Sequence, residues 1–121
     1  IQYAHARICS IFRTASERGI KPLDSVDIDL SPLKNEEEFV MIKKILSFTE
    51  IIEKSAELLE VHRVAFYLQD LVGTFHRYYS RNRIVSDDHA LSFARLFLMN
   101  CLRITICNGL SIMGVSSPER M

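Results

Sequence analysis

The sequence predicts an all-α protein, a compact bundle of four or five helices. Apolar residues recur at steps of three and four along most of the chain, which is the period of one helix face. No stretch has the strict alternation of a half-buried strand. With 121 residues, of which 48% are hydrophobic, the chain can bury one core. We therefore expect one domain over residues 1–121.

The first predicted helix covers residue 1 to about residue 18 and ends at Gly19, which suits a left-handed C-terminal cap. Its apolar positions have helical spacing: Ile1, Ala4, Ile8, Ile11, Phe12 and Ala15. Residues 20–33 contain two prolines and several aspartates and follow neither period. They predict an exposed loop.

The second helix is predicted to begin near Asn35, because the acidic run at 36–38 complements the positive end of the helix dipole. It should end near Ser47, and a restart near Thr49 predicts a further short helix to about residue 59. The residues expected on the buried side of the first of these two helices are Val40, Met41, Ile45, Leu46 and Phe48.

Two longer helices complete the bundle. Residues 61–79 carry one apolar stripe over several turns. The last helix is expected to begin after Ser86-Asp87-Asp88, which offers a cap, and to end before Gly114. It is apolar on nearly all sides, which predicts a central position in the bundle. Its interspersed arginines and asparagines make it too polar to be expected as a membrane span.

Charge is balanced overall, with 15 basic and 15 acidic residues, but it is unevenly distributed. Residues 1–21 and 61–121 carry an excess of bases, and residues 22–60 an excess of acids. If the two basic segments meet, they form a positive face with the acidic segment turned away. The seven lysine-or-arginine positions after residue 60 are all arginine, which suits phosphate contacts. The alternative is that these arginines simply solvate helix faces.

Signals for catalysis or metal binding are weak. His5 and Cys9 lie one helical turn apart, but no companion pair completes a zinc site, which disfavours a small metal-dependent enzyme. Nucleophile and phosphate-loop motifs are missing from the sequence. Cys9, Cys101 and Cys107 lie in apolar helical patterns and are expected to be reduced structural residues. We expect no catalytic residue, cofactor or metal in this chain. It begins at Ile1, already in helical register and without Met, which is typical of a fragment.

The segment 75–83 reads FHRYYSRNR and interleaves aromatic rings with guanidinium groups. Single-stranded RNA requires this mixture, since rings stack on unpaired bases and cations hold the backbone. Phe75 is the exception, which we assign to the core. The alternative for the others is a core stripe with solvated arginines. The candidates for RNA contact here are His76, Arg77, Tyr79, Arg81 and Arg83, and Tyr3, His5, Arg7 and Arg13 repeat the chemistry on the first helix.

Several stretches, in order, resemble the C-terminal anticodon-binding domain of arginyl-tRNA synthetases. They are QYAHARI at 2–8, FHRYY at 75–79, ARL at 94–96, NGLSIMGV at 108–115 and SPERM at 117–121. Residues 19–33 have no counterpart. The resemblance implies the type of domain named for an Asp-Ala-Leu-Arg signature, although this chain reads FARL at 93–96. It also implies a missing class I catalytic domain, which would hold ATP and Mg²⁺, so the fragment alone would not activate arginine.

The resemblance also implies roles for individual residues. Tyr79 and Met121 match positions that help form the pocket for the middle base of the anticodon, a cytosine in most arginine tRNAs. We infer that a carboxylate at Met121 would accept from its amino group. Tyr3 and Arg7 match an opening Tyr-x-x-x-Arg and are expected to stack and to contact phosphate, although Arg7 could instead pair with an acid. Further electrostatic candidates are Arg13, Arg77, Arg81 and Arg83.

The partners implied are the anticodon loop of tRNA(Arg) and the catalytic domain of the same parent chain. The expected location is the cytoplasm, away from membranes, with the fragment a monomer or weak dimer. The competing class is a helical protein-interaction module with no nucleic-acid role. Salt separates the two, because RNA binding through arginines weakens steeply as salt rises.

Overall fold

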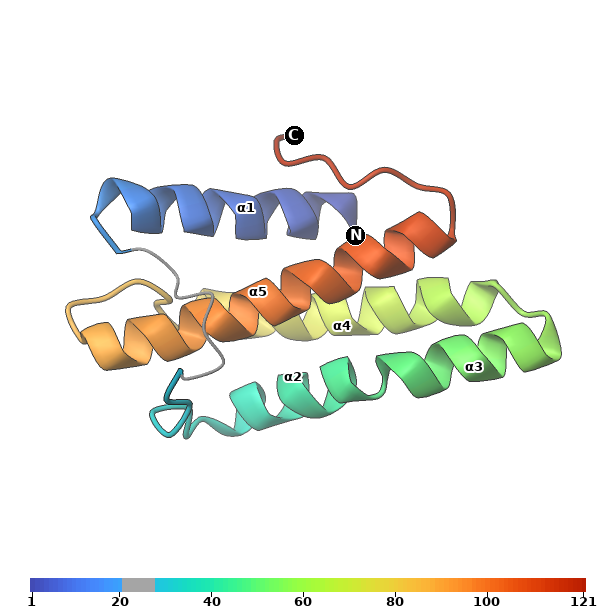
Figure 1. Ribbon diagram of the computed structural model, residues 1–121, viewed down its shortest axis with the longest axis horizontal. Coiled ribbons are helices and arrows are strands. Elements are labelled where there is room, and N and C mark those ends of the chain that lie inside the picture. The colour runs from blue at the N-terminus through green and yellow to red at the C-terminus, as the bar shows by residue number, and fades with distance from the viewer. Residues whose placement is uncertain (21–27) are drawn as a thin grey trace.

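The computed structural model describes residues 1–20 and 28–121, and five helices lie in those residues (Figure 1). No strand occurs in the described part of the chain, and the predicted all-α class is confirmed. The helices are α1 (Gln2–Glu17), α2 (Glu36–Leu46), α3 (Phe48–Leu58), α4 (His62–Arg81) and α5 (His89–Ile112).

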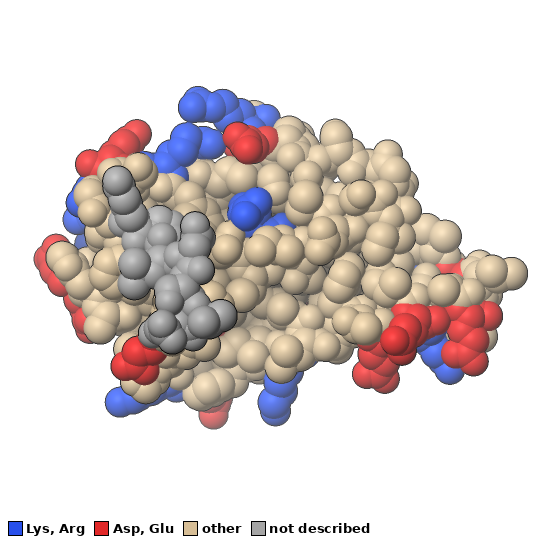
Figure 2. Space-filling view, viewed as in Figure 1, with Lys and Arg blue, Asp and Glu red and all other residues tan. Residues whose placement is uncertain are grey.

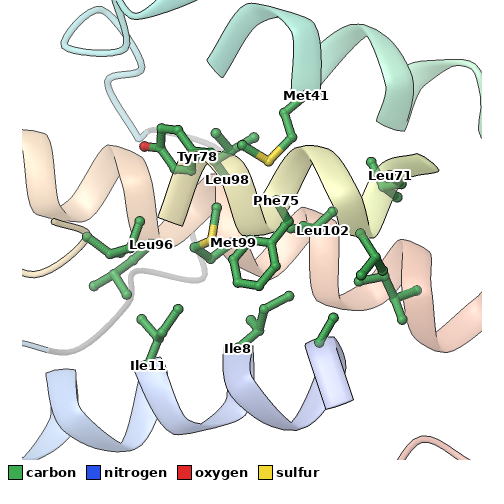
Figure 3. Close-up of a cluster of buried hydrophobic side chains, with 14 of the residues drawn as sticks. Ile8, Ile11, Met41, Leu71, Phe75, Tyr78, Leu96, Leu98, Met99 and Leu102 are labelled. Atoms are coloured by element: carbon green, nitrogen blue, oxygen red, sulfur yellow. The ribbon is translucent and has the colours of Figure 1, made fainter. Parts of the chain in front are cut away.

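Helix α5 has a central position, as expected from its composition, and shares it with α4, which contacts all four other helices. Helix α5 contacts α1, α2 and α4, while α2 and α3 follow one another along the side opposite α1 (Figure 1). Fully buried side chains from four helices meet around it, among them Ile8, Met41, Phe75 and Leu102 (Figure 3). Burial of this shared apolar surface holds α1 in place along the bundle.

Four predicted helix ends are confirmed. The Asn35 side chain accepts from the backbone N–H of Glu37 and completes a capping box with Glu38. At the start of α5 the Asp88 carboxylate accepts from the N–H of Leu91. Gly19 and Gly114 follow α1 and α5 with φ of 76° and 71°, the left-handed conformation that glycine adopts without strain.

The predicted break between α2 and α3 is also present, at Ser47, whose hydroxyl donates to the carbonyl of Lys44. The predicted buried side of α2 was partly wrong. Met41 is fully buried, but Val40 is 45% exposed and Leu46 is 75% exposed. The face that α2 turns to the core follows residues 38, 41 and 45, and Val40 and Leu46 lie off that helical spacing.

The predicted exposed loop at 20–33 is corrected at its two ends. Ile20 and Leu33 are both buried in the core cluster, because each lies next to a helix end that places it against the bundle. The Ile20 N–H also donates to the carbonyl of Ala15, which continues the cap of α1 inward. The middle of that predicted loop, 21–27, lies outside the described residues.

Glu38 belongs to the acidic run that starts α2, but its side chain is fully buried. One carboxylate oxygen accepts from the Tyr78 hydroxyl at 2.5 Å and from Nε of Arg95 at 2.9 Å. The other accepts from the N–H of Asn35 at 3.1 Å. Burial and the carboxylate together raise the pKa of Tyr78 far above its usual value, so its hydroxyl remains a donor. This cluster joins α2, α4 and α5.

Helix α5 also corrects the expectation that it is too polar to span a membrane. Its length and its mean hydropathy of 1.5 are sufficient by composition. The central helix of a globular bundle meets the same criterion, and the residues of α5 pack against the surrounding helices. Hydropathy here therefore reflects the core position.

We expect Leu102→Ala to reduce the free energy of unfolding by ~2 to 5 kcal/mol, because the side chain is fully buried and its loss leaves a cavity. Urea unfolding followed by circular dichroism measures this loss. Leu46→Ala is the matched control, since this leucine is 75% exposed and its truncation should change stability by less than ~0.5 kcal/mol. Equal effects of the two substitutions would contradict a central α5.

Glu38→Ala should cost ~3 to 5 kcal/mol of stability, because it leaves the Arg95 guanidinium without its buried counter-ion. Glu37→Ala, one residue earlier, removes a pair to the exposed Arg81 at 3.5 Å and should cost ~1 kcal/mol or less. The same unfolding assay compares them. A Glu38 variant as stable as the Glu37 variant would show that the buried cluster contributes little.

Candidate nucleic-acid interface

A hollow of about 420 Å³ opens between α1, the end of α4 and the last residues of the chain. Five of the ten side chains predicted to contact RNA line it: Tyr3, Arg7, Arg13, Tyr79 and Met121. Ala6, Ser10 and Arg120 complete its lining, and sequence reasoning did not select them. Three segments far apart in the sequence, residues 3–13, 79 and 120–121, thus meet at one place.

Arg7 lies between the two tyrosine rings. Its Cζ is 5.4 Å from the ring centroid of Tyr3 and 5.1 Å from that of Tyr79, within the range of cation–π attraction. Among the described residues, both recorded contacts of the Arg7 guanidinium are therefore with aromatic rings. Held between them, the guanidinium keeps hydrogen-bond donors available for a ligand.

The ring of Tyr79 is supported from the core side. Phe75 lies one turn earlier in α4, and its ring centroid is 5.7 Å from that of Tyr79, with the ring planes at 29°. Phe75 is fully buried, as predicted. His76 lies 6.3 Å from Tyr3, and burial together with the nearby Arg7 lowers the pKa of His76. His76 is therefore a neutral ring at pH 7, beside the hollow rather than among its lining residues.

The chain's end reaches the hollow because α1 holds it there. Gln2 Nε2 donates to the carbonyl of Ser116 at 2.8 Å, and Arg13 Nη1 donates to that of Glu119 at 3.3 Å. Between them, His5 Nδ1 lies 3.0 Å from the carbonyl of Pro118. Since a carbonyl can only accept, Nδ1 carries the proton. Figure 1 shows this C-terminal segment, residues 115–121, running back over α1.

His5 therefore takes a structural role, and its expected share in the RNA-binding chemistry of α1 is corrected. Its side chain is buried, on the face of α1 that meets the C-terminal segment. Cys9 Sγ lies 3.8 Å from His5 Nδ1, but no group of three or more metal-binding side chains occurs among the described residues. Cys9, Cys101 and Cys107 are free thiols, each half-buried.

A second hollow, of about 640 Å³, adjoins the first. Arg81 and Arg83 line it, and Ser10 and Tyr79 line both hollows. Arg77 lines neither, since its Nη2 donates to Thr74 Oγ1, which also accepts from Lys44 of α2. Arg77 and Arg81 are one turn apart and share a side of α4, so the difference comes from the direction of the Arg77 side chain, which bonds to Thr74.

The two basic segments of the chain do meet, but the acidic segment is not wholly turned away, because Glu37 and Glu38 of α2 pair with Arg81 and Arg95. Arginines from both line the two hollows. Figure 2 shows Lys and Arg, with some Asp and Glu among them, along the edge where α1 and the chain's end lie, and a group of Asp and Glu at the lower right, where Figure 1 places α3. A polyanion would be attracted to the first end and repelled from the second.

Comparison with known proteins gives a consistent result. The family model of the DALR anticodon binding domain matches residues 1–121. The chain is 49% identical to an arginine–tRNA ligase of Geotalea uraniireducens and 48% identical to one of Symbiobacterium thermophilum, in each case over 100% of this chain and 22% of the relative. A solved arginyl-tRNA synthetase of Thermus thermophilus superposes with a TM-score of 0.84 at 31% identity, over 99% of this chain and 20% of that one.

We expect Gln2→Ala to loosen the C-terminal segment, because it removes the bond to the Ser116 carbonyl. Heteronuclear NOE values of residues 115–121 should fall, while the free energy of unfolding changes by only ~1 kcal/mol or less, since the bond is exposed. Gln69→Ala, at an exposed position of α4, is the control. An unchanged C-terminal segment in the Gln2 variant would show that the side chain does not hold it.

Proposed function

Because this chain belongs to the DALR anticodon binding domain family, we propose that it binds the anticodon loop of tRNA(Arg) as the C-terminal domain of an arginyl-tRNA synthetase. One observation carries the proposal: two tyrosine rings, an arginine between them and a methionine line one hollow. Rings, thioether and guanidinium are the groups that hold an unpaired base and its backbone.

In this proposal the middle base of the anticodon enters the first hollow. The ring of Tyr79 and the thioether of Met121 pack on the face of the base, and Arg7 holds a phosphate or a base edge. Arg13 and Arg120 supply further positive charge at the rim. Cytosine is the base expected there, which the resemblance to the family implies.

The chain spans about a fifth of the length of the curated relatives it matches. We therefore propose that activation of arginine with ATP and Mg²⁺, and its transfer to tRNA, are carried out by a catalytic domain elsewhere in the parent protein. That catalytic domain is the second proposed partner of this chain. The proposed location of the parent protein is the cytoplasm. The protein-interaction module is less favoured, because such a module does not need a hollow lined by arginines.

Titration of the chain with an anticodon stem-loop of tRNA(Arg) tests the proposal. We expect binding that weakens as salt rises, because arginine–phosphate contacts release counterions. Replacing the middle cytosine should weaken binding by ~1 to 3 kcal/mol, since a wrong base leaves polar groups unpaired. Fluorescence anisotropy at two salt concentrations measures both effects. Binding that ignores the middle base would remove base recognition from the function.

Tyr79→Ala should weaken binding of the stem-loop by ~1 to 3 kcal/mol, the contribution of one stacked base. Tyr79→Phe is the matched variant, because it keeps the ring and should bind the stem-loop nearly as tightly as the unsubstituted chain does. Circular dichroism checks that both are folded. If the alanine variant binds as tightly as the phenylalanine variant, no base stacks on residue 79.

A further inference from the structure

The second hollow has the composition of a binding site that the function described so far does not use. It lies between α1 and the segment that follows α4, next to the first hollow. Its rim carries three guanidinium groups with hydroxyl and amide side chains, and its floor is apolar. The lining residues are Ser10, Ile11, Thr14, Arg18, Tyr79, Ser80, Arg81, Asn82, Arg83, Ile84 and Val85.

Its charge selects an anion. No carboxylate lines it among the described residues. Arg81 has only an exposed contact to Glu37 at 3.5 Å, and within the described part of the chain the Arg83 side chain forms no recorded ion pair or hydrogen bond. Arg18 donates one bond to the carbonyl of Val85 and keeps its remaining donors. Guanidinium groups of this kind bind phosphate in a bidentate manner.

One stripe of α1 joins the two hollows. Its residues Tyr3, Arg7, Ser10, Thr14 and Arg18 follow at steps of four, three, four and four, so they share one helix face. Tyr3 and Arg7 line the first hollow, Thr14 and Arg18 the second, and Ser10 both. Tyr79, from α4, forms the other part of the shared wall. An RNA chain with one base in the first hollow can therefore continue directly into the second.

We propose that the second hollow binds a backbone phosphate of the RNA nucleotide adjacent to the base held in the first. The inference rests on the proposed function and adds a second subsite to it. Arg83 and Arg18 contact the phosphate oxygens, and Arg81 contributes to the positive field. A phosphate contact fixes the register of the loop but reads no sequence, so the first hollow alone distinguishes bases.

The buried core holds the wall of this subsite in place. Arg95 Nη1 donates to the backbone carbonyl of Arg83 at 2.8 Å, while its Nε is paired with the buried Glu38. Asn82 donates from its side chain to the carbonyl of Tyr78, and Ile84 and Val85 are buried. The backbone that carries Arg83 is therefore fixed before RNA arrives, which lowers the cost of binding.

Arg83→Gln tests the subsite, with Arg77→Gln as the matched control, because Arg77 is an exposed arginine of the same region that lines neither hollow. Both are titrated with the anticodon stem-loop and its middle-base variants over a range of salt. We expect Arg83→Gln to weaken every stem-loop about tenfold, without loss of base preference. The slope of log K against log salt should fall by about 0.7, the value for one phosphate of a single strand. Arg77→Gln should change neither quantity.

A methylphosphonate at either phosphate flanking the middle nucleotide identifies the ligand. At one of the two positions, loss of the phosphate charge should weaken binding to the unsubstituted chain about tenfold. The same loss should not weaken binding to the Arg83→Gln variant any further. Independent losses at both positions would overturn the subsite, as would equal effects of the Arg83 and Arg77 substitutions. If the unsubstituted chain binds no stem-loop, the proposed function itself is overturned. Base-selective binding unaffected by Arg83→Gln would overturn the subsite alone.

Discussion

The structure depends on the burial of one carboxylate. A charged group in an apolar core is costly unless every polar atom around it is paired. Glu38 meets this condition because its two oxygens accept from Tyr78, Arg95 and the backbone of Asn35. Satisfying it fixes the start of α2 against α4 and α5. Arg95 then extends the constraint outward, since its Nη1 donates to the carbonyl of Arg83 at the edge of the second hollow.

A second set of contacts completes the candidate site from the other end of the chain. Gln2, His5 and Arg13 project from α1 toward three backbone carbonyls of the C-terminal segment, which brings Met121 to the rim of the first hollow. Backbone carbonyls accept whatever residue carries them, so this arrangement fixes the path of the segment without requiring particular side chains there. The site is thus assembled between elements that are themselves held by the core, an arrangement that favours binding with little reordering.

Much of the fold could be predicted from the sequence, because helical periodicity and capping residues are local signals. Asn35, Asp88, Gly19 and Gly114 are examples of helix ends that the sequence predicted. Burial of Glu38 could not be predicted, since an acidic run at a helix start usually lies in solvent and its partners are 40 and 57 residues away. In the site, Tyr3, Arg7 and Tyr79 came from their chemistry and the family resemblance. Sequence reasoning did not select Arg18, although its helical spacing from Thr14 was visible. It selected Arg77, which lines neither hollow, because the bond from Arg77 to Thr74 depends on a side-chain conformation that the sequence does not show.

The central claim is that one unpaired base occupies the hollow between α1, the end of α4 and Met121. Intermolecular NOEs between the chain and an anticodon stem-loop test it most directly, because they report protons within a few ångströms of each other. We expect the H5 and H6 protons of the middle cytosine to show NOEs to the ring protons of Tyr79 and the methyl group of Met121. NOEs from that base to α2 or α3 instead, with none to Tyr79 or Met121, would contradict the account.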